Sequence, residues 1–150
     1  MQIDANNEVH FGDFIRLNEL WITEHFSLEE SDRALAENPS QVITKGGHIF
    51  SLVSSGKVLG VCALFRDGAD RYQLARMAVE PAERGKGHGN TLIEHALVKA
   101  KELGASSIYL LSNTVLQSAI ALYQKHGFKA IATGPHPIYA RCNIVMERAL

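Results

Sequence analysis

A basic, glycine-dense segment directly before a helical pattern is the part of the sequence best suited to chemistry. Residues 84–89 read Arg-Gly-Lys-Gly-His-Gly, and an apolar run ending in Glu-Pro precedes them. The start of a helix exposes unpaired backbone N–H groups and carries a partial positive charge, so it attracts anions. Glycines let an anion approach those groups. Arg84 and Lys86 add positive charge, as does His88 once protonated. The segment predicts a site for a phosphorylated ligand, a diphosphate in particular.

The spacing of these glycines excludes two common phosphate-binding loops. The nucleotide P-loop requires GxxxxGK[ST], but here Gly87 follows the lysine. The dinucleotide fingerprint GxGxxG would start at Gly85 and require a third glycine where the chain has Asn90. The remaining pattern is Arg-x-x-Gly-x-Gly after a strand. Taken alone, this pattern is equally compatible with a purely structural turn.

A second segment has chemistry-bearing residues at a defined spacing. Residues 112–128, SNTVLQSAIALYQKHGF, place an asparagine at a strand end and then a helix closing in A-x-x-x-Y-x-K-x-G-F. Together with the Arg-x-x-Gly-x-Gly loop, this segment resembles the two signatures of the GNAT N-acetyltransferases. The resemblance runs from residue 47 to the C-terminus. One departure is the gap from Asn113 to Ala119, which is longer than in the shortest N-x-x-A form of the family.

The resemblance implies acetyl-coenzyme A as the cosubstrate. No metal is expected, because no CxxC or clustered Cys/His spacing points to a metal site. In this family the strand before the loop and the strand after the helix splay apart, and the pantetheine arm pairs with the first of them. In this chain the matching backbone is that of Met77, Ala78 and Val79, where a bulge would free N–H groups. A free N–H group near Ala78 would stabilise the oxyanion. The diphosphate would lie on the N–H groups from Arg84 to Asn90. The expected coenzyme contacts are Met77, Ala78, Val79, Arg84, Gly85, Lys86, Gly87, His88, Gly89, Asn90, Asn113 and Ala119.

The implied reaction is direct attack of a primary amine on the thioester, through a tetrahedral intermediate. Tyr123 is expected to be the general acid that assists the departing thiolate. Many members of the family have a basic glutamate on the strand before the loop, where this chain has Gln73, which cannot accept a proton usefully. Weaker candidates for the base are Glu24, His25, Glu29 and His48. Gln73 keeps an alternative open, a catalytically weak regulatory module that binds coenzyme A.

The acceptor implied by the resemblance is a small-molecule amine or a protein amino group. Between Glu19 and Glu37 the acidic residues far outnumber the basic ones, of which Arg33 is the single example. If this segment borders the acceptor cleft, an acidic rim would attract a cationic amine. A solvated helix face gives the same pattern.

Hydrophobic periodicity predicts the elements that must position these residues. Phe14, Leu17, Leu20 and Trp21 form the expected apolar stripe of a first helix, and Ser27 is the expected N-cap of a second. A mixture of adjacent strands and strands separated by helices predicts an α/β (α+β) fold. The resemblance specifies a mixed, mostly antiparallel sheet flanked by helices, with splayed central strands. Helices are predicted over 11–26, 27–38, 90–104 and 114–127, and strands over 48–55, 57–67, 71–80, 106–113, 128–133 and 139–150.

Composition limits the remaining possibilities. With 150 residues, 46% of them apolar, the chain is expected to form a single domain over residues 1–150. A net charge of -1 argues against nucleic acid as a partner, and the apolar runs are too short to span a membrane. Two cysteines in apolar surroundings and the absence of a signal-peptide pattern favour a cytoplasmic protein. An exposed C-terminal strand would support a homodimer.

Overall fold

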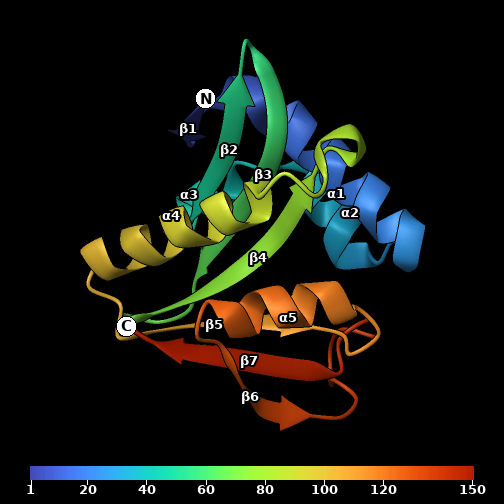
Figure 1. Ribbon diagram of the computed structural model, residues 1–150, viewed down its shortest axis with the longest axis vertical. Helices are drawn as coiled ribbons and strands as arrows, with labels where there is room; N and C mark the ends of the chain where they lie inside the picture. Colours follow the sequence, from blue (N-terminus) through green and yellow to red (C-terminus); the bar gives the residue numbers. More distant parts are fainter.

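A seven-stranded sheet runs through the molecule in the order β1-β2-β3-β4-β5-β7-β6 (Figure 1). The computed structural model describes residues 1–150. All neighbouring strands are antiparallel except β4 and β5, which are parallel. The predicted class, a mixed and mostly antiparallel sheet with helices, is confirmed. The strands are β1 (Gln2–Ala5), β2 (His48–Ser54), β3 (Lys57–Arg66), β4 (Arg71–Val79), β5 (Ser107–Ser112), β6 (Lys129–Thr133) and β7 (Ile144–Ala149).

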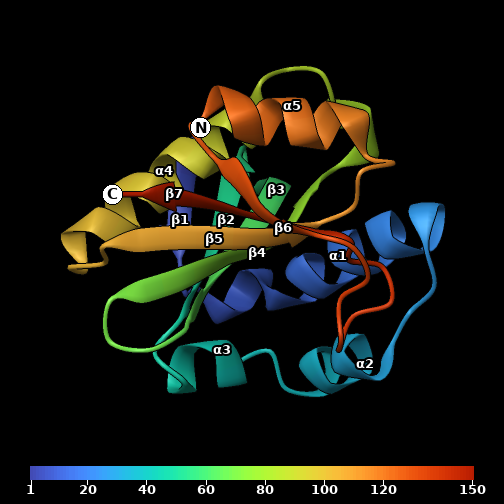
Figure 2. The same cartoon turned by 90° about the horizontal axis from the view of Figure 1, so that it is seen from below.

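Helices cover both faces of the sheet (Figure 2). Helices α1, α2 and α3 lie on one face, and α4 and α5 lie on the other. Side chains alternate along β3, so Cys62 and Leu64 enter the core beneath α4 while Val61 and Ala63 enter the core beneath α1. The helices are α1 (Phe11–His25), α2 (Glu30–Glu37), α3 (Gln41–Thr44), α4 (His88–Glu102) and α5 (Gln117–Lys125), with short 3-10 turns η1 (Glu8–His10) and η2 (Pro81–Glu83).

The central strands separate soon after they meet. Strands β4 and β5 pair only from Arg71 to Gln73, opposite Ser107 to Tyr109, and then diverge (Figure 1). The expected splay is therefore present, and it opens a wedge between the carboxyl ends of the two strands.

A β-bulge distorts β4 where it borders this wedge. Ala63 of β3 pairs with Ala75 and Val61 pairs with Ala78, so Arg76 and Met77 together face the single residue Cys62. Arg76 has a φ of 58°, in the left-handed region that few side chains other than glycine adopt. The sequence reasoning placed a bulge at Met77 to Val79, and the observed bulge begins one residue earlier.

Several elements differ from their prediction. Strand β1 was not predicted, because its four residues show no clear alternation, and it is held by pairing with β2. Leu20 is 45% exposed because α1 buries Phe11, Phe14, Asn18 and Ile22, a stripe that turns away from it. The last predicted strand begins at Ile144 rather than at residue 139, because residues 139–143 form turns.

The start of α2 was also predicted wrongly. Its N-cap is Glu29 rather than Ser27, and its capping box joins Glu29 to Asp32. Asp32 thereby accepts a hydrogen bond from the backbone N–H of Glu29 at 2.8 Å. This capping role fixes Asp32 at the end of α2 that faces the C-terminal part of the sheet.

Candidate functional site

The loop before α4 forms a backbone cradle at the mouth of the wedge. Gly87 is the N-cap of α4, with a φ of 85°, and no side chain caps the helix. The backbone N–H groups from Gly85 to Asn90 have no hydrogen-bond partner within the protein, whereas that of Arg84 donates to the carbonyl of Pro81. A Cβ atom added at Gly85 or Gly87 would meet nothing within 4 Å. The cradle therefore opens onto free space that side chains at these positions would enter.

A cavity of about 350 Å³ adjoins this cradle. It brings together most of the residues that the sequence reasoning expected at the coenzyme site. These are Met77, Ala78, Val79, Arg84, Gly85, Gly87, His88, Gly89, Asn90 and Ala119, joined by Trp21, Glu83, Ser118 and Leu122. Lys86 and Asn113 do not line this cavity.

The basic side chains of the loop are already paired with carboxylates. Arg84 donates to both oxygens of Glu24, at 3.0 and 2.8 Å, which lowers the pKa of Glu24. Lys86 lies 3.0 Å and His88 lies 3.1 Å from Glu83, and hydrogen bonds from these two side chains lower its pKa. The sequence reasoning counted these cations as free. The anion-binding feature that remains uncompensated is the row of backbone N–H groups.

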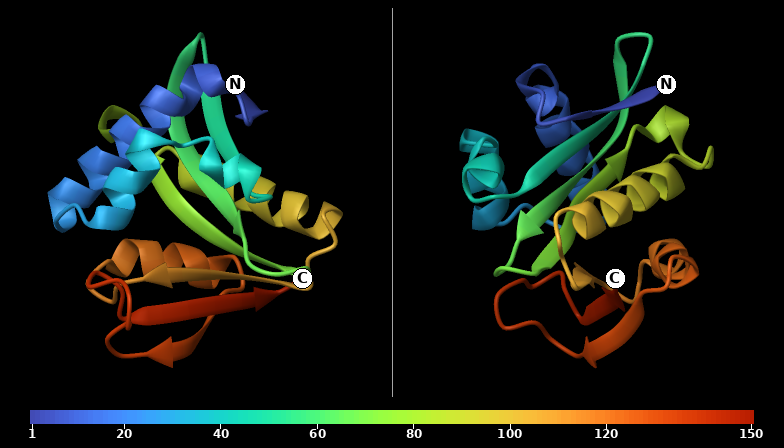
Figure 3. Two further views of the ribbon diagram at one scale, coloured as in Figure 1. Left: turned by 180° about the vertical axis from the view of Figure 1, so that it is seen from behind. Right: turned by 90° about the vertical axis from the view of Figure 1, so that its left-hand side faces the viewer.

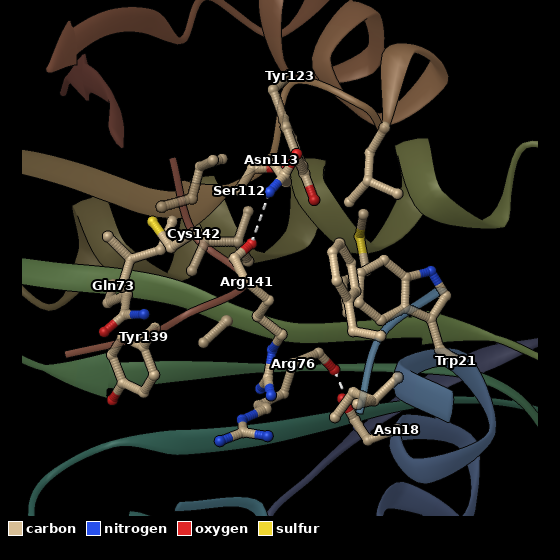
Figure 4. Close-up of a pocket in the computed structure, with 18 of the residues that line it drawn as sticks. Asn18, Trp21, Gln73, Arg76, Ser112, Asn113, Tyr123, Tyr139, Arg141 and Cys142 are labelled. Carbon is tan, nitrogen blue, oxygen red and sulfur yellow. Dashed lines mark hydrogen bonds between the residues drawn. The ribbon is translucent and has the colours of Figure 1, made fainter. Parts of the chain in front are cut away.

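A second pocket, of about 120 Å³, lies deeper in the wedge (Figure 4). Met77 and Trp21 line both cavities, so the second pocket adjoins the one beside the cradle. Apolar and aromatic side chains make up most of its wall. They are Trp21, Ile22, Phe26, Phe65, Leu74, Ala75, Met77, Leu110, Leu111, Leu116, Tyr139 and Cys142.

Tyr123 of α5 also lines this second pocket, and Figure 4 shows its hydroxyl pointing into it. Its ring packs edge-on against Phe128, with the ring centroids 6.1 Å apart. Burial, and to a smaller extent the neighbouring Cys62, raises the pKa of Tyr123 to about 12. The hydroxyl consequently stays protonated at neutral pH and can donate a hydrogen bond.

Asn113 and Gln73 lie in the second pocket as well, and both have protein partners. The amide nitrogen of Asn113 donates to the carbonyl of Arg141 at 3.1 Å, and its oxygen accepts from the N–H of Val115. The oxygen of Gln73 accepts a long, 3.4 Å hydrogen bond from the hydroxyl of Tyr109. Asn113 therefore anchors the loop between β6 and β7 to the end of β5.

None of the weaker base candidates lines either cavity. Glu24 pairs with Arg84 and Glu29 pairs with Arg141. His25 is exposed and packs against Trp21, while the ring of His48 contacts Asn6 beside β1. The second pocket contains no carboxylate and no histidine.

Sequence reasoning missed an ionic cluster at the end of the second pocket. Asp32 is 2% exposed and accepts hydrogen bonds from Arg76, at the bulge, and from Arg141, at 2.7 Å through each oxygen. Arg141 also pairs with Glu29 at 2.9 Å. The loop between β6 and β7 crosses to α2 to make these contacts (Figures 2 and 3). The one sequence signal was an arginine, Arg76, inside the otherwise apolar run of residues 74–79.

The same cluster bears on the expectation that acidic residues at the cleft would attract a cationic amine. Burial acts to raise the pKa of Asp32, but hydrogen bonds from Arg141, the Glu29 N–H and Arg76 outweigh it and lower that pKa. Glu24, Glu29 and Asp32 are all paired with arginines. The carboxylates next to the cleft are therefore neutralised, and the charged side chains that line the second pocket are Arg76 and Arg141.

Three negative observations complete the description. No group of three His, Cys, Asp or Glu side chains is placed to hold a metal ion. The helices lack the length and apolar character that crossing a membrane would require. Cys62 and Cys142 are both buried and unbonded to each other.

Known proteins resemble this chain in both sequence and structure. An N-acetyltransferase of Escherichia coli K12, YjgM, which is itself uncharacterized, is 36% identical over 95 residues, 61% of this chain and 57% of that protein. The chain thus matches little more than half the length of this relative. An acetyltransferase of the GNAT family from Staphylococcus aureus Mu50 superposes with a TM-score of 0.86 at 21% identity, over 99% of both chains. An aminoglycoside 6'-N-acetyltransferase complexed with coenzyme A superposes with a TM-score of 0.77 at 17% identity, over 99% of this chain and 97% of that one.

The family model described as acetyltransferase (GNAT) family matches residues 14–128. That range begins in α1, contains the bulge, the cradle and Tyr123, and ends just after α5. Because the match spans most of the chain and the fold agrees with solved members, this protein belongs to the GNAT acetyltransferase family.

Proposed function

We propose that this protein is an N-acetyltransferase that moves the acetyl group of acetyl-coenzyme A to a primary amine. The observation that carries the proposal is the row of unpaired N–H groups from Gly85 to Asn90, which lies beside a cavity that continues to Tyr123. A diphosphate is the ligand that such a row of donors at a helix start suits. The coenzyme A bound to the aminoglycoside acetyltransferase of the same fold supports this choice.

The residues around the first cavity would hold the coenzyme. The N–H groups from Gly85 to Asn90 would bind the diphosphate, with Lys86 at the rim, and Ala119 would line the opposite wall. Arg84 is 39% and Glu24 is 47% exposed, and ion pairs this exposed contribute little. Arg84 can therefore exchange Glu24 for a phosphate. The wedge edge of β4, from Met77 to Val79, would face the pantetheine arm because β5 has already turned away.

The chain's own groups would support acyl transfer at the junction of the two cavities. A backbone N–H near Ala78, beside the bulge, would donate to the oxygen that becomes negative during attack. The Tyr123 hydroxyl would donate its proton to the sulfur that leaves. The acetyl group ends on the amine, one amine proton is lost, and free thiol is released. Asn113 would contribute by holding the pocket wall in place.

The amine must lose a proton before it attacks, because an alkylamine with a pKa of about 10.4 is mostly protonated at neutral pH. No carboxylate or histidine lines the second pocket. The acceptor would therefore enter as the small neutral fraction already present in water. A regulatory module that binds coenzyme A and transfers slowly is the second candidate, and the amide at Gln73 is the observation that favours it.

Two measurements on the same preparation test the proposal. Calorimetry should detect acetyl-coenzyme A binding with one site per chain, and a thiol-release assay over a panel of primary amines should detect turnover. Binding together with amine-dependent release supports the transferase. Binding with no release from any amine favours the module, and absence of binding overturns both.

A further inference from the structure

The second pocket has a polar end that the proposed acetyl transfer does not use. Arg76 and Arg141 both pair with the carboxylate of Asp32. Figure 4 shows the two arginine side chains at the far end of the pocket from Tyr123. Their side chains are 12% and 17% exposed. Guanidinium groups removed from water to this extent need hydrogen-bond acceptors, because an unpaired buried charge is costly.

The carboxylates of the cluster leave part of both guanidinium groups without a partner. Arg76 donates only through Nη1, to Asp32. Arg141 donates through Nη1 and Nη2, to Glu29 and Asp32. Nε and Nη2 of Arg76 and Nε of Arg141 have no protein acceptor, and none of them is fully enclosed. Because both side chains line the second pocket, these N–H groups are candidate donors for a ligand bound there.

Asp32 cannot supply what these donors lack. Its two oxygens already accept from the N–H of Glu29, from Arg76 and from both terminal nitrogens of Arg141. The other wall residues of the pocket are apolar, aromatic or amide side chains and the hydroxyl of Ser112, and none of them carries a negative charge. An anion would therefore be the natural complement of this end of the pocket.

We infer that the acceptor amine carries a carboxylate, which binds Arg76 and Arg141 while the amine is directed toward Tyr123 and the bulge. This inference rests on the proposed function and names its substrate class. A carboxylate suits the arginines because it can accept two parallel N–H hydrogen bonds from one guanidinium. The pocket volume of about 120 Å³ and the rings of Trp21, Phe26 and Tyr139 fit a small acceptor with an apolar or aromatic body. An amino acid with an apolar or aromatic side chain has the amine, the carboxylate and the apolar body that this pocket requires.

The inference reverses the charge preference expected from the sequence. The acidic residues of the N-terminal helices suggested a cationic acceptor, but those nearest the cleft are bound to Arg84, Arg76 and Arg141. A polyamine would meet guanidinium groups at the end of the pocket. A carboxylated amine would instead complete their hydrogen bonding.

Acceptors with and without the carboxylate test the inference, with each kcat/KM calculated on the concentration of unprotonated amine because the amine pKa differs between them. We expect kcat/KM with L-phenylalanine to exceed that with L-phenylalaninamide and with 2-phenylethylamine by at least about tenfold. The amide also represents the N-terminus of a peptide, so it separates a free amino acid from a protein acceptor. An equal or higher kcat/KM with either compound that lacks the carboxylate, with turnover otherwise normal, overturns the inference and leaves the acetyltransferase proposal standing.

Variants locate the preference in the arginines. We call the kcat/KM with L-phenylalanine divided by that with L-phenylalaninamide the acid-to-amide ratio. Arg76→Gln and, separately, Arg141→Gln should reduce this ratio by at least about tenfold. Arg33→Gln, an exposed arginine on the same helix as Asp32, should leave the ratio unchanged. Circular dichroism and calorimetry with acetyl-coenzyme A show whether each variant is folded. An unchanged ratio in folded Arg76→Gln and Arg141→Gln overturns the inference.

A binding measurement covers the case in which no amine of the panel is acetylated. Protein loaded with coenzyme A should bind 3-phenylpropanoate at least about tenfold more tightly than 3-phenylpropanamide. The difference should disappear in Arg76→Gln. Equal binding of the acid and the amide contradicts the inference without reference to catalysis.

Discussion

The side chain of Asn18 holds the bulge of β4 by donating a hydrogen bond to the carbonyl of Arg76 at 3.1 Å (Figure 4). The same nitrogen donates to the carbonyl of Phe14 at 2.9 Å, so α1 and the bulge share one buried amide. Because Arg76 has a φ of 58°, its peptide carbonyl turns out of the regular ladder and finds this partner on the helix.

Asn18→Ala should therefore disturb the bulge. Loss of the amide leaves the Arg76 carbonyl buried without a partner, which costs about 1–3 kcal/mol. We expect the free energy of unfolding to fall by that amount in urea titrations and kcat/KM to fall at the same time. Thr23→Ala, which removes an exposed hydrogen bond of the same helix, is the control. Equal stability of the two variants would contradict the role given to Asn18.

Gly87→Ala should weaken acetyl-coenzyme A binding by at least about tenfold. The added Cβ points into the space in front of the cradle, where the diphosphate would lie. Its positive φ also costs about 1–2 kcal/mol of stability. Gly68→Ala is a matched control, because Gly68 has the same φ of 85° and equally open surroundings but lies in the turn between β3 and β4. If calorimetry gave the same Kd of acetyl-coenzyme A for Gly87→Ala and Gly68→Ala, the cradle would not be part of the binding site.

Tyr123→Phe should lower turnover about a hundredfold and leave the Kd of acetyl-coenzyme A nearly unchanged. Tyr109→Phe is the matched control, because burial raises the pKa of Tyr109 to about 12 as well, but its hydroxyl contacts Asp67 and Gln73 and lies outside both cavities. Steady-state kinetics with a fixed amine distinguish the two. Full activity in Tyr123→Phe would show that another group protonates the thiolate.

The pH dependence of kcat/KM should follow the acceptor amine alone. With no carboxylate or histidine in the second pocket, the rate should rise about tenfold per pH unit until the pKa of the amine is approached. Gln73→Glu supplies a carboxylate at the wall and should add an inflection at lower pH. A plateau between pH 6 and pH 8 in the unmodified protein, pH values set by the ordinary range of histidine, would reveal a base outside the pocket.

Asp32→Asn should destabilise the protein by about 3–5 kcal/mol at pH 7, because both arginines lose their shared partner. The pKa of Asp32 is lowered in the folded state, so its contribution is complete above the unfolded value of about 3.9 and is lost as pH falls below it. The difference in unfolding free energy between the unmodified protein and Asp32→Asn should therefore shrink from pH 7 to pH 3. Asp13→Asn, in an exposed ion pair, should cost no more than about 1 kcal/mol.

Local signals in the sequence were sufficient for most of the fold. Periodicity predicted α1 and α4 and the two successive strands β2 and β3. Strand β1 was not predicted because four residues are too few to show a periodic pattern, and this strand is held in place by pairing with β2. The N-cap of α2 was misassigned because Asp32 serves both as capping residue and as partner of Arg141, which lies 109 residues away.

In the candidate site, too, features formed by neighbouring residues could be predicted from the sequence, whereas contacts between distant segments could not. The residues of the cradle are consecutive, so the glycines and the start of the helix could be recognised from the sequence. The spacing of residues in the second segment pointed to Tyr123 in the same way. The pairings of Arg84 with Glu24 and of Arg141 with Asp32 join distant segments, and no local pattern encodes them. The prediction that the basic side chains of the loop are free was wrong, because tertiary contacts pair them with carboxylates. The role of the loop's backbone in binding a diphosphate stays a prediction.

The short junction between β4 and β5 has a mechanical consequence. Strand pairing between the two halves of the sheet is confined to Arg71–Gln73, with one further main-chain hydrogen bond from Ser106 to Asp70. A side-chain contact of 2.8 Å between Asn90 and His126 joins the helices above the gap. A molecule lodged along the open edge would act as a surrogate strand and stiffen the two halves into one body. Binding of a molecule in the gap should therefore slow hydrogen exchange of the backbone amides in both β4 and β5.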